Sequence, residues 1–257
     1  MTIHYRTAEE IEKIRAANRI VAAALDRLEE IVKPGITTVE LDREAEALIR
    51  DMGGRPSFKG YRGFPNALCV AVNDQVVHGI PGKQALKAGD IIGLDVGVEK
   101  EGYYGDAART VPVGETSQEA IKLMEVTMES LMKGIAEIRP GARVSDISHA
   151  IQSHVESHGY SVVTAYVGHG IGSSPHEEPQ VPNFGRKGRG PILREGMVLA
   201  IEPMVNIGGP DVTLMKDGWT VRTSDGSLSA HFEHSVAVVR GGGDVLSVGS
   251  KNVKKLS

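Results

Sequence analysis

Two short sequence patterns each occur twice in this chain of 257 residues, at almost the same separation. Residues 33–41 (KPGITTVEL) are matched by residues 139–147 (RPGARVSDI), 106 positions later. Residues 86–95 (LKAGDIIGLD) are matched by residues 193–202 (LREGMVLAIE), 107 positions later. Self-similarity at a fixed offset indicates a structural unit that occurs twice. The repeat therefore predicts two similar α+β halves related by a pseudo-two-fold axis.

Each copy reads as a pair of helices followed by a strand that ends in a carboxylate, Asp95 in the first copy and Glu202 in the second. Thr7 and Thr37 are each followed three residues later by glutamate, which is the capping-box signature of a helix start. The predicted helices cover residues 7–33, 37–53, 117–138 and 145–158. The predicted strands cover residues 67–72, 91–98, 103–113, 162–167, 198–205, 219–222 and 231–239.

Composition restricts the class of protein. The net charge of -4 gives no general attraction to nucleic acid or to a membrane surface. The chain has no apolar segment at its N-terminus and no apolar run of membrane-spanning length. Cys69 is the single cysteine, so an intrachain disulfide cannot form. We therefore expect a cytoplasmic protein with no membrane partner and no direct nucleic-acid substrate.

A predicted hairpin carries two acids, Asp95 in Leu-Asp-Val-Gly and Asp106 in Tyr-Gly-Asp. A turn centred on Lys100 and Glu101 places these two residues directly opposite one another. Like charges that face each other across a strand pair destabilise a sheet. Either a cation lies between the two carboxylates, or one is protonated, or the pair lies on a solvated surface. This segment alone leaves the three alternatives open.

Three more residues continue the pattern. His169 stands within Gly-His-Gly-Ile-Gly, Glu202 within Ile-Glu-Pro-Met and Glu233 within Phe-Glu-His-Ser. A lone histidine in such a context is more often structural, but acids are rarely buried without a partner. With Asp95 and Asp106 they make four carboxylates and one imidazole, which suits Mn²⁺, Fe²⁺ or Co²⁺ and is unlike a structural zinc site. Sites that hold two such ions are typically hydrolytic.

These motifs resemble those of the type I, or bacterial-type, methionine aminopeptidases, peptidases with the pita-bread fold. The resemblance extends from the first helix to about Arg240. It implies one catalytic domain (1–257) of α+β class, whose pseudo-symmetric halves, about 7–113 and 114–240, carry helices outside a curved antiparallel sheet. It also implies two divalent ions, with Co, Mn or Fe favoured and Zn or Ni compatible. The five metal ligands that it implies are Asp95, Asp106, His169, Glu202 and Glu233.

The resemblance further implies catalytic roles for three residues. His78 matches the histidine that contacts the scissile amide nitrogen, and His176 matches the one that bonds the carbonyl oxygen. Glu202 matches a glutamate that both binds metal and carries a proton to the leaving amine. The residues that match the wall of the family's methionine pocket are Tyr61, Phe64, Cys69 and Trp219. The implied activity is removal of the initiator methionine from nascent proteins when the second residue is small.

Partners follow from the same resemblance. The substrate is the N-terminus of a nascent polypeptide, and the basic residues of 186–189 suit a transient, salt-sensitive ribosome contact or simply a solvated loop. A monovalent cation held by backbone carbonyls near Asn73, Gln75 and Ser229 is also compatible, and we expect a monomer. The remaining histidines match no motif position and are expected to be structural or solvated: His4, His149, His154, His158, His231 and His234.

The alternative within this fold is an Xaa-Pro aminopeptidase or proline dipeptidase, which shares the five ligands. Such enzymes usually carry an additional N-terminal domain, whereas here the first helix of the catalytic domain already begins at Thr7. A non-enzymatic binding module of this fold would lack ligands. The chain departs from many relatives at Ser173-Ser174, at Ala107-Ala108 and at Phe58, which affects the detail of the pocket rather than the ligand set.

Overall fold

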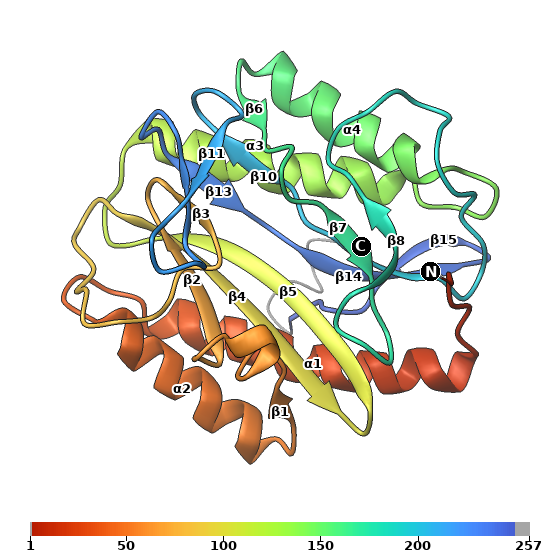
Figure 1. Cartoon of the computed structure of the whole chain (residues 1–257), viewed down its shortest axis with the longest axis horizontal. Coiled ribbons are helices and arrows are strands. Elements are labelled where there is room, and N and C mark those ends of the chain that lie inside the picture. Colours follow the sequence, from red (N-terminus) through yellow and green to blue (C-terminus); the bar gives the residue numbers. More distant parts are fainter. Residues whose placement is uncertain (1, 250–257) are drawn as a thin grey trace.

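The computed structural model describes residues 2–249, and its helices lie on two opposite sides of a set of antiparallel strands (Figure 1). In that range the helices are α1 (Ala8–Ile31), α2 (Thr38–Asp51), α3 (Gln118–Ala136) and α4 (Val144–Ser157), with a 3₁₀ turn, η1, at Tyr61–Gly63. Helices α1 and α2 cover the strands of the first half, and α3 and α4 cover those of the second (Figure 1). None of these helices combines the length and apolar character that crossing a membrane requires.

The predicted helix starts are confirmed by their caps. The Oγ1 atom of Thr7 accepts a hydrogen bond from the Glu10 N–H at 3.2 Å, and the Glu10 carboxylate accepts one from the Thr7 N–H at 2.8 Å. The Thr37 N–H donates in the same way to Glu40 at 2.8 Å. Each box satisfies N–H groups that have no partner within the helix, which fixes where the helix begins.

The repeat in the sequence corresponds to equivalent backbone contacts in the two halves. The Gly35 N–H donates to the carbonyl of Leu86 at 2.8 Å, and the Gly141 N–H donates to the carbonyl of Leu193 at 2.9 Å. Both glycines have φ of +92°, a conformation that strains any residue with a Cβ atom. In each half this hydrogen bond joins the turn between two helices to the segment that precedes a strand. The first of these strands contains Asp95, and the second ends just before Glu202.

The sheet of the first half is built around a long hairpin. Its strands are β1 (Arg55–Pro56), β2 (Leu68–Val72), β4 (Ile91–Lys100) and β5 (Tyr103–Pro112). Strand β4 pairs with β5 along one edge and with β1 and β2 along the other, all antiparallel. The side chains of β4 and β5 that face α1 form an apolar core with those of the helices, including Leu25, Leu41, Leu68 and Leu94.

The predicted register of this hairpin was wrong by two residues. The turn lies at Glu101 and Gly102, both with positive φ (53° and 81°), as a two-residue type I′ turn requires. Asp106 therefore pairs with Gly97, and Asp95 pairs with Ala108. The two acids are diagonal neighbours on one face of the sheet, which still brings long side chains within reach of each other.

The second half contains a five-stranded sheet of order β15-β14-β9-β7-β8. Its strands are β7 (Gly168–Gly170), β8 (Glu177–Val181), β9 (Val198–Ile201), β14 (His234–Val239) and β15 (Gly242–Val245). Two smaller sheets have the orders β13-β10-β6 and β11-β12-β3. Their strands are β3 (Gln75–Val77), β6 (Ser161–Val162), β10 (Met204–Asn206), β11 (Val212–Leu214), β12 (Val221–Thr223) and β13 (Ser229–His231).

Two runs that were predicted as single strands are each broken in the middle. Residues 198–205 form β9 and β10, and residues 231–239 form β13 and β14, with the members of each pair in different sheets. The first break falls at Glu202 and Pro203, where proline has no N–H to continue a ladder. The second falls at Phe232 and Glu233. Both acids therefore lie where the chain passes from one sheet to another.

The link between α2 and β2 offers a test of what holds the first half together. Asp42 on α2 accepts hydrogen bonds from the N–H groups of Ala67 (2.9 Å) and Leu68 (3.0 Å) and from the side chain of Asn66 (2.7 Å). Asp42→Ala leaves buried donors unpaired, so we expect a loss of about 2–3 kcal/mol in the free energy of unfolding. Urea denaturation measures this loss.

The matched control is Glu44→Ala on the exposed side of the same helix. Glu44 pairs with Arg27 in solvent, 2.7 Å away. Removing an exposed pair of this kind should change stability by less than about 1 kcal/mol. Equal effects of the two substitutions would show that Asp42 does not hold β2 in place.

Candidate metal centre

A single cavity collects residues from both halves of the chain. Its wall contains every predicted ligand, both predicted catalytic histidines and the four predicted pocket residues. These are Tyr61, Phe64, Cys69, His78, Asp95, Asp106, His169, His176, Glu202, Trp219 and Glu233. The first half supplies residues up to Asp106, and the second half supplies the rest. The cavity thus lies at the junction that the pseudo-two-fold arrangement creates.

Backbone contacts fix the acids relative to one another. The Glu233 N–H donates to the carbonyl of Ala108 at 2.9 Å, which joins β5 of the first half to the break before β14. The Ser235 hydroxyl donates to the carbonyl of Asp106 at 2.7 Å. One ligand atom from each of Asp106, His169 and Glu233 lies within 4.8 Å of those of the other two. Asp106 and Glu233 are therefore held near one another by these two hydrogen bonds.

Burial opposes the charged form of all four acids, and for three of them repulsion by neighbouring acids adds to it. Burial raises the pKa of Asp95 to about 7. Burial also raises the pKa of Asp106 and of Glu233 well above the usual range, and the charges of neighbouring acids add to the effect. The pKa of Glu202 rises for the same two reasons. Carboxylates that close become fully charged only with a compensating cation or added hydrogen bonds.

The donor set fits divalent metal ions. Among the described residues, Oδ1 of Asp95, Oδ1 of Asp106 and Oε1 of Glu233 are buried without a hydrogen-bond partner. Nδ1 of His169 lies 2.9 Å from the carbonyl of Gly170, which makes Nδ1 the protonated nitrogen. Its Nε2 then carries the lone pair and lies 3.4 Å from Oε1 of Glu202. Histidines that bind a metal through one ring nitrogen typically donate a hydrogen bond from the other, as Nδ1 of His169 does to Gly170.

The two predicted catalytic histidines stand at the cavity beside this cluster. His78 has φ of +61°, an uncommon backbone conformation for a residue with a side chain, and such strain often marks a functional position. Burial lowers the pKa of His78 to about 4, with a further contribution from His176. His176 is more exposed, and its ring centroid lies 4.3 Å from that of His169. Nδ1 of His176 is 3.0 Å from the Tyr61 hydroxyl, and partial burial lowers its pKa too.

One wall of the cavity is apolar and aromatic. The rings of Phe64 and Trp219 meet edge to face, with centroids 5.1 Å apart. Phe58, Phe64 and Cys69 are buried together, with Trp219 packed against them. Burial raises the pKa of the Cys69 thiol well above its usual value, so the thiol is neutral. This wall suits an uncharged, flexible side chain.

Two residues at or near the cavity were not predicted as part of the site, Arg62 and His231. Arg62 lines the cavity, and no motif around η1 signalled it. Phe58 also lines the cavity, in agreement with its expected effect on the detail of the pocket. His231, which was expected to be structural or solvated, is buried, and its Nε2 lies 3.8 Å from Oε2 of Glu202. Burial lowers the pKa of His231 to about 3. In the sequence, the position of His231 two residues before Glu233 was the feature that could have indicated its closeness to the site.

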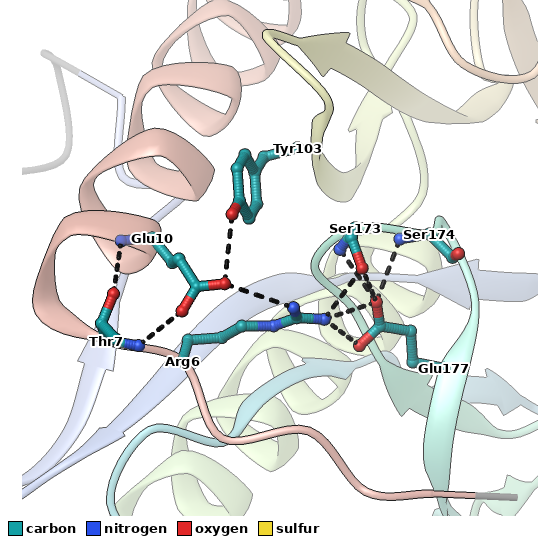
Figure 2. Close-up of polar contacts among 7 residues, drawn as sticks. All are labelled: Arg6, Thr7, Glu10, Tyr103, Ser173, Ser174 and Glu177. Atoms are coloured by element: carbon teal, nitrogen blue, oxygen red, sulfur yellow. Dashed lines mark hydrogen bonds and ion pairs between the residues drawn. The ribbon is translucent and has the colours of Figure 1, made fainter.

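The loop that carries His176 is fastened through the next residue, Glu177 (Figure 2). The Glu177 carboxylate accepts hydrogen bonds from the backbone N–H groups of Ser173 (2.8 Å) and Ser174 (3.0 Å). It also pairs with the guanidinium of Arg6 at 2.6 Å. The side chains of Arg6 and Glu177 are each only 8% exposed, so solvent screens this ion pair less than a surface pair.

The same arginine connects this loop to the start of α1. Figure 2 shows the Arg6 guanidinium between Glu177 and Glu10, which it approaches to 3.6 Å. Glu10 is the partner of Thr7 in the capping box of α1 and also accepts a hydrogen bond from the Tyr103 hydroxyl at 3.1 Å. The Arg6 N–H donates to the carbonyl of Gly196 at 2.7 Å. Arg6, just before α1, therefore fastens the loop that carries His176 to the start of α1 and to Gly196.

Comparison with known proteins identifies the family. The model of metallopeptidase family M24 matches residues 12–240. Methionine aminopeptidase 1 of Bacillus subtilis is 52% identical over 242 residues, which cover 94% of this chain and 98% of that protein. The chain belongs to the methionine aminopeptidases of family M24. This result confirms the resemblance drawn from the motifs.

Solved structures of other M24 peptidases agree with the fold of this family member. The crystal structure of methionine aminopeptidase from Rickettsia prowazekii superposes with a TM-score of 0.95 at 43% identity, covering 96% of this chain and all of that one. A prolidase from Pyrococcus furiosus gives a TM-score of 0.78 at 22% identity, covering 95% of this chain and 65% of that one. The second likeness concerns the fold alone. The predicted pita-bread fold is confirmed.

The raised pKa of Asp106 predicts how the metal-free protein responds to pH. An unfolded aspartate loses its proton near pH 4, whereas folded Asp106 keeps its proton to a much higher pH. Between these values the folded state binds more protons, so Asp106 lowers the free energy of unfolding as pH rises. In chelator, Asp106→Asn should therefore gain Tm relative to the unsubstituted protein, and gain more at pH 8 than at pH 5.

Adding Mn²⁺ should reverse the order of the two proteins, because the variant has lost a ligand. The buried histidines also titrate, but they are common to both proteins and cancel in the difference. A Tm difference that stayed constant from pH 5 to pH 8 in chelator would contradict the burial of an uncompensated acid at this position.

Proposed function

We propose that this chain removes the N-terminal methionine from nascent polypeptides whose second residue is small, and that it does so in the cytoplasm. The observation that carries the proposal is the meeting of two features in one cavity. One is a set of buried carboxylate oxygens without partners, and the other is an apolar wall formed by Phe64, Cys69 and Trp219. The family assignment of the chain supports the same activity.

Five side chains would hold the metal: Asp95, Asp106, His169, Glu202 and Glu233. Two divalent ions bound there would supply Lewis-acid activation of a peptide carbonyl and of water near neutral pH. A ligand set rich in carboxylates favours Mn²⁺, Fe²⁺ or Co²⁺ over ions that prefer imidazole or thiolate. The suggestion of a monovalent cation stays a prediction. Two of the residues predicted to lie near that cation, Asn73 and Ser229, are neighbours in the structure, since the Ser229 N–H donates to the carbonyl of Asn73 at 2.9 Å.

The chain's own groups would carry the proton and orient the substrate. Glu202 faces the cavity between His169 and His231 and would pass a proton from the attacking water to the leaving amine. His176, at the rim, would donate a hydrogen bond to the carbonyl oxygen as negative charge develops on it. His78, neutral at pH 7 because its pKa is about 4, would contact the leaving nitrogen.

Substrate preference would follow from the shape of the cavity. A methionine side chain is unbranched and polarisable, which suits the aromatic wall of Phe64 and Trp219. Tyr61, which also lines the cavity, would complete this methionine pocket. Beyond the scissile bond, His78 and the carbonyl held at the metal site would leave little room for a large second residue. The partner would be the N-terminus of a polypeptide emerging from a ribosome. A direct ribosome contact through residues 186–189, and a monomeric state, remain proposals.

The test of this function compares four tripeptides by their kcat/KM values. Met-Ala-Ser should be cleaved well, Leu-Ala-Ser and Met-Leu-Ser much more slowly, and Leu-Pro-Ser least. Each misfit methylene costs only about 1–3 kcal/mol, so the poor substrates should be slow rather than inert. Chelator should abolish turnover, and Mn²⁺, Co²⁺ or Fe²⁺ should restore it. Preference for Leu-Pro-Ser over Met-Ala-Ser would favour an Xaa-Pro peptidase instead.

Substitutions should separate metal ligands from catalytic groups. Glu233→Ala should lose bound metal and activity together. His176→Ala should retain metal and lower kcat by roughly 10²-fold or more, as loss of an oxyanion donor does elsewhere. Metal content by mass spectrometry and steady-state kinetics measure the two effects. The control is His149→Ala, a substitution at an exposed residue of α4, which should change neither. Loss of metal from His176→Ala would reassign that residue as a ligand.

A further inference from the structure

A second group of metal-ligating side chains lies away from the central cavity. Glu129 of α3, His154 of α4 and His158, the residue that directly follows α4, each offer one ligand atom within 4.8 Å of the other two. Helices α3 and α4 pack along each other on the outside of the second half (Figure 1). None of the three residues lines the central cavity, so this group is independent of the proposed activity.

The sequence spacing of the two histidines places them on one helical face. Residues four positions apart are neighbours on an α-helix, and the two ring centroids are 4.6 Å apart. Nε2 of His154 lies 3.0 Å from Oε2 of Glu129 on the adjacent helix. The side chain of His154 is only 10% exposed, whereas that of Glu129 is 54% exposed. One ligand is thus built into the helix interface and another is open to solvent.

The hydrogen bond of His158 prepares its ring for a cation. Nδ1 of His158 lies 2.8 Å from the carbonyl oxygen of His154, which makes Nδ1 the protonated nitrogen. Nε2 then carries the lone pair, as it does in ligating histidines that donate from their other nitrogen to a carbonyl. The same bond also caps the last turn of α4. Capping accounts for His158, but it does not explain why His154 and Glu129 converge on the same point.

We propose that Glu129, His154 and His158 form a second divalent-metal site that fastens α3 to α4. Two imidazoles and one carboxylate suit Zn²⁺, with water in the fourth position. The central cluster has one imidazole and four carboxylates, so the two sites differ in the ion that each prefers. Burial lowers the pKa of His154, which keeps its ring neutral and able to bind a cation near pH 7. The nearby charge of Lys133 also lowers that pKa and opposes a bound cation.

The experiment is a Zn²⁺ titration followed in two ways. Equilibrium dialysis compares the intact chain with His154→Ala, His158→Ala and Glu129→Gln. Long-range ¹H–¹⁵N spectra of the histidine side chains follow the same titration up to millimolar Zn²⁺. The matched control is His149→Ala, which removes an exposed histidine of α4 that contacts Ser153 rather than Glu129.

We expect the intact chain and the His149→Ala control to bind one more equivalent of Zn²⁺ than either of the other two alanine variants. Glu129→Gln should weaken that step at least roughly tenfold, and Lys133→Gln should strengthen it. The ¹⁵N signals of His154 and His158 should shift together, and that of His149 should not. Equal stoichiometry in all variants, with no concerted shift, would mean that these residues serve only as a cap and an ion pair.

Discussion

Four acidic side chains forced into one buried space are the constraint on which this fold depends. Burial and the charges of neighbouring acids raise the cost of charging Asp106 and Glu233, and a compensating cation or added hydrogen bonds would lower that cost. Holding such groups together requires a rigid frame. The bonds between Ala108 and Glu233 and between Ser235 and Asp106 supply it by joining β5 of one half to β14 of the other.

The placement of the acids follows from how strands end in this fold. Asp95 and Asp106 lie within a continuous hairpin, whereas Glu202 and Glu233 lie where the chain leaves one sheet and enters another. A residue at such a break need not follow the rule that successive side chains of a strand point to opposite faces of the sheet. Its side chain can therefore turn toward the acids of the other half. The apolar cores on either side, beneath α1 and α2 and beneath α3 and α4, keep both sets of strands in place.

Local chemistry was predictable from the sequence, and long-range geometry was only partly so. The capping boxes at Thr7 and Thr37 and the repeated Pro-Gly junctions gave the helix starts and the two-halved plan. The register of the hairpin was missed because Glu101 carries no turn signal of its own; Gly102 allows the positive φ that the following position needs. The prediction of one strand over 198–205 overlooked Pro203, although proline rarely continues a ladder.

The central site itself was recognisable because the five residues predicted as its ligands stand in distinctive local motifs. His231 was not, because its approach to Glu202 joins positions that are distant in the sequence. Arg62 was not recognisable either, because it belongs to the irregular turn η1, whose path is set by tertiary packing rather than by periodicity. The cluster of Glu129, His154 and His158 was likewise hidden, because the pairing of α3 with α4 brings its members together.

The pairing of Arg6 with Glu177 has a consequence for how the molecule is made. The two residues are 171 positions apart, and the bridge between Ile3 and Glu178 spans a similar separation. A ribosome that synthesises this chain releases Arg6 long before it reaches Glu177. The rim beside His176 can therefore close only after about half of the second half has emerged, and its closure should be among the late steps of folding because the loop it completes is so long. An unfinished chain would hold Asp95 and Asp106 without the groups that complete the cavity.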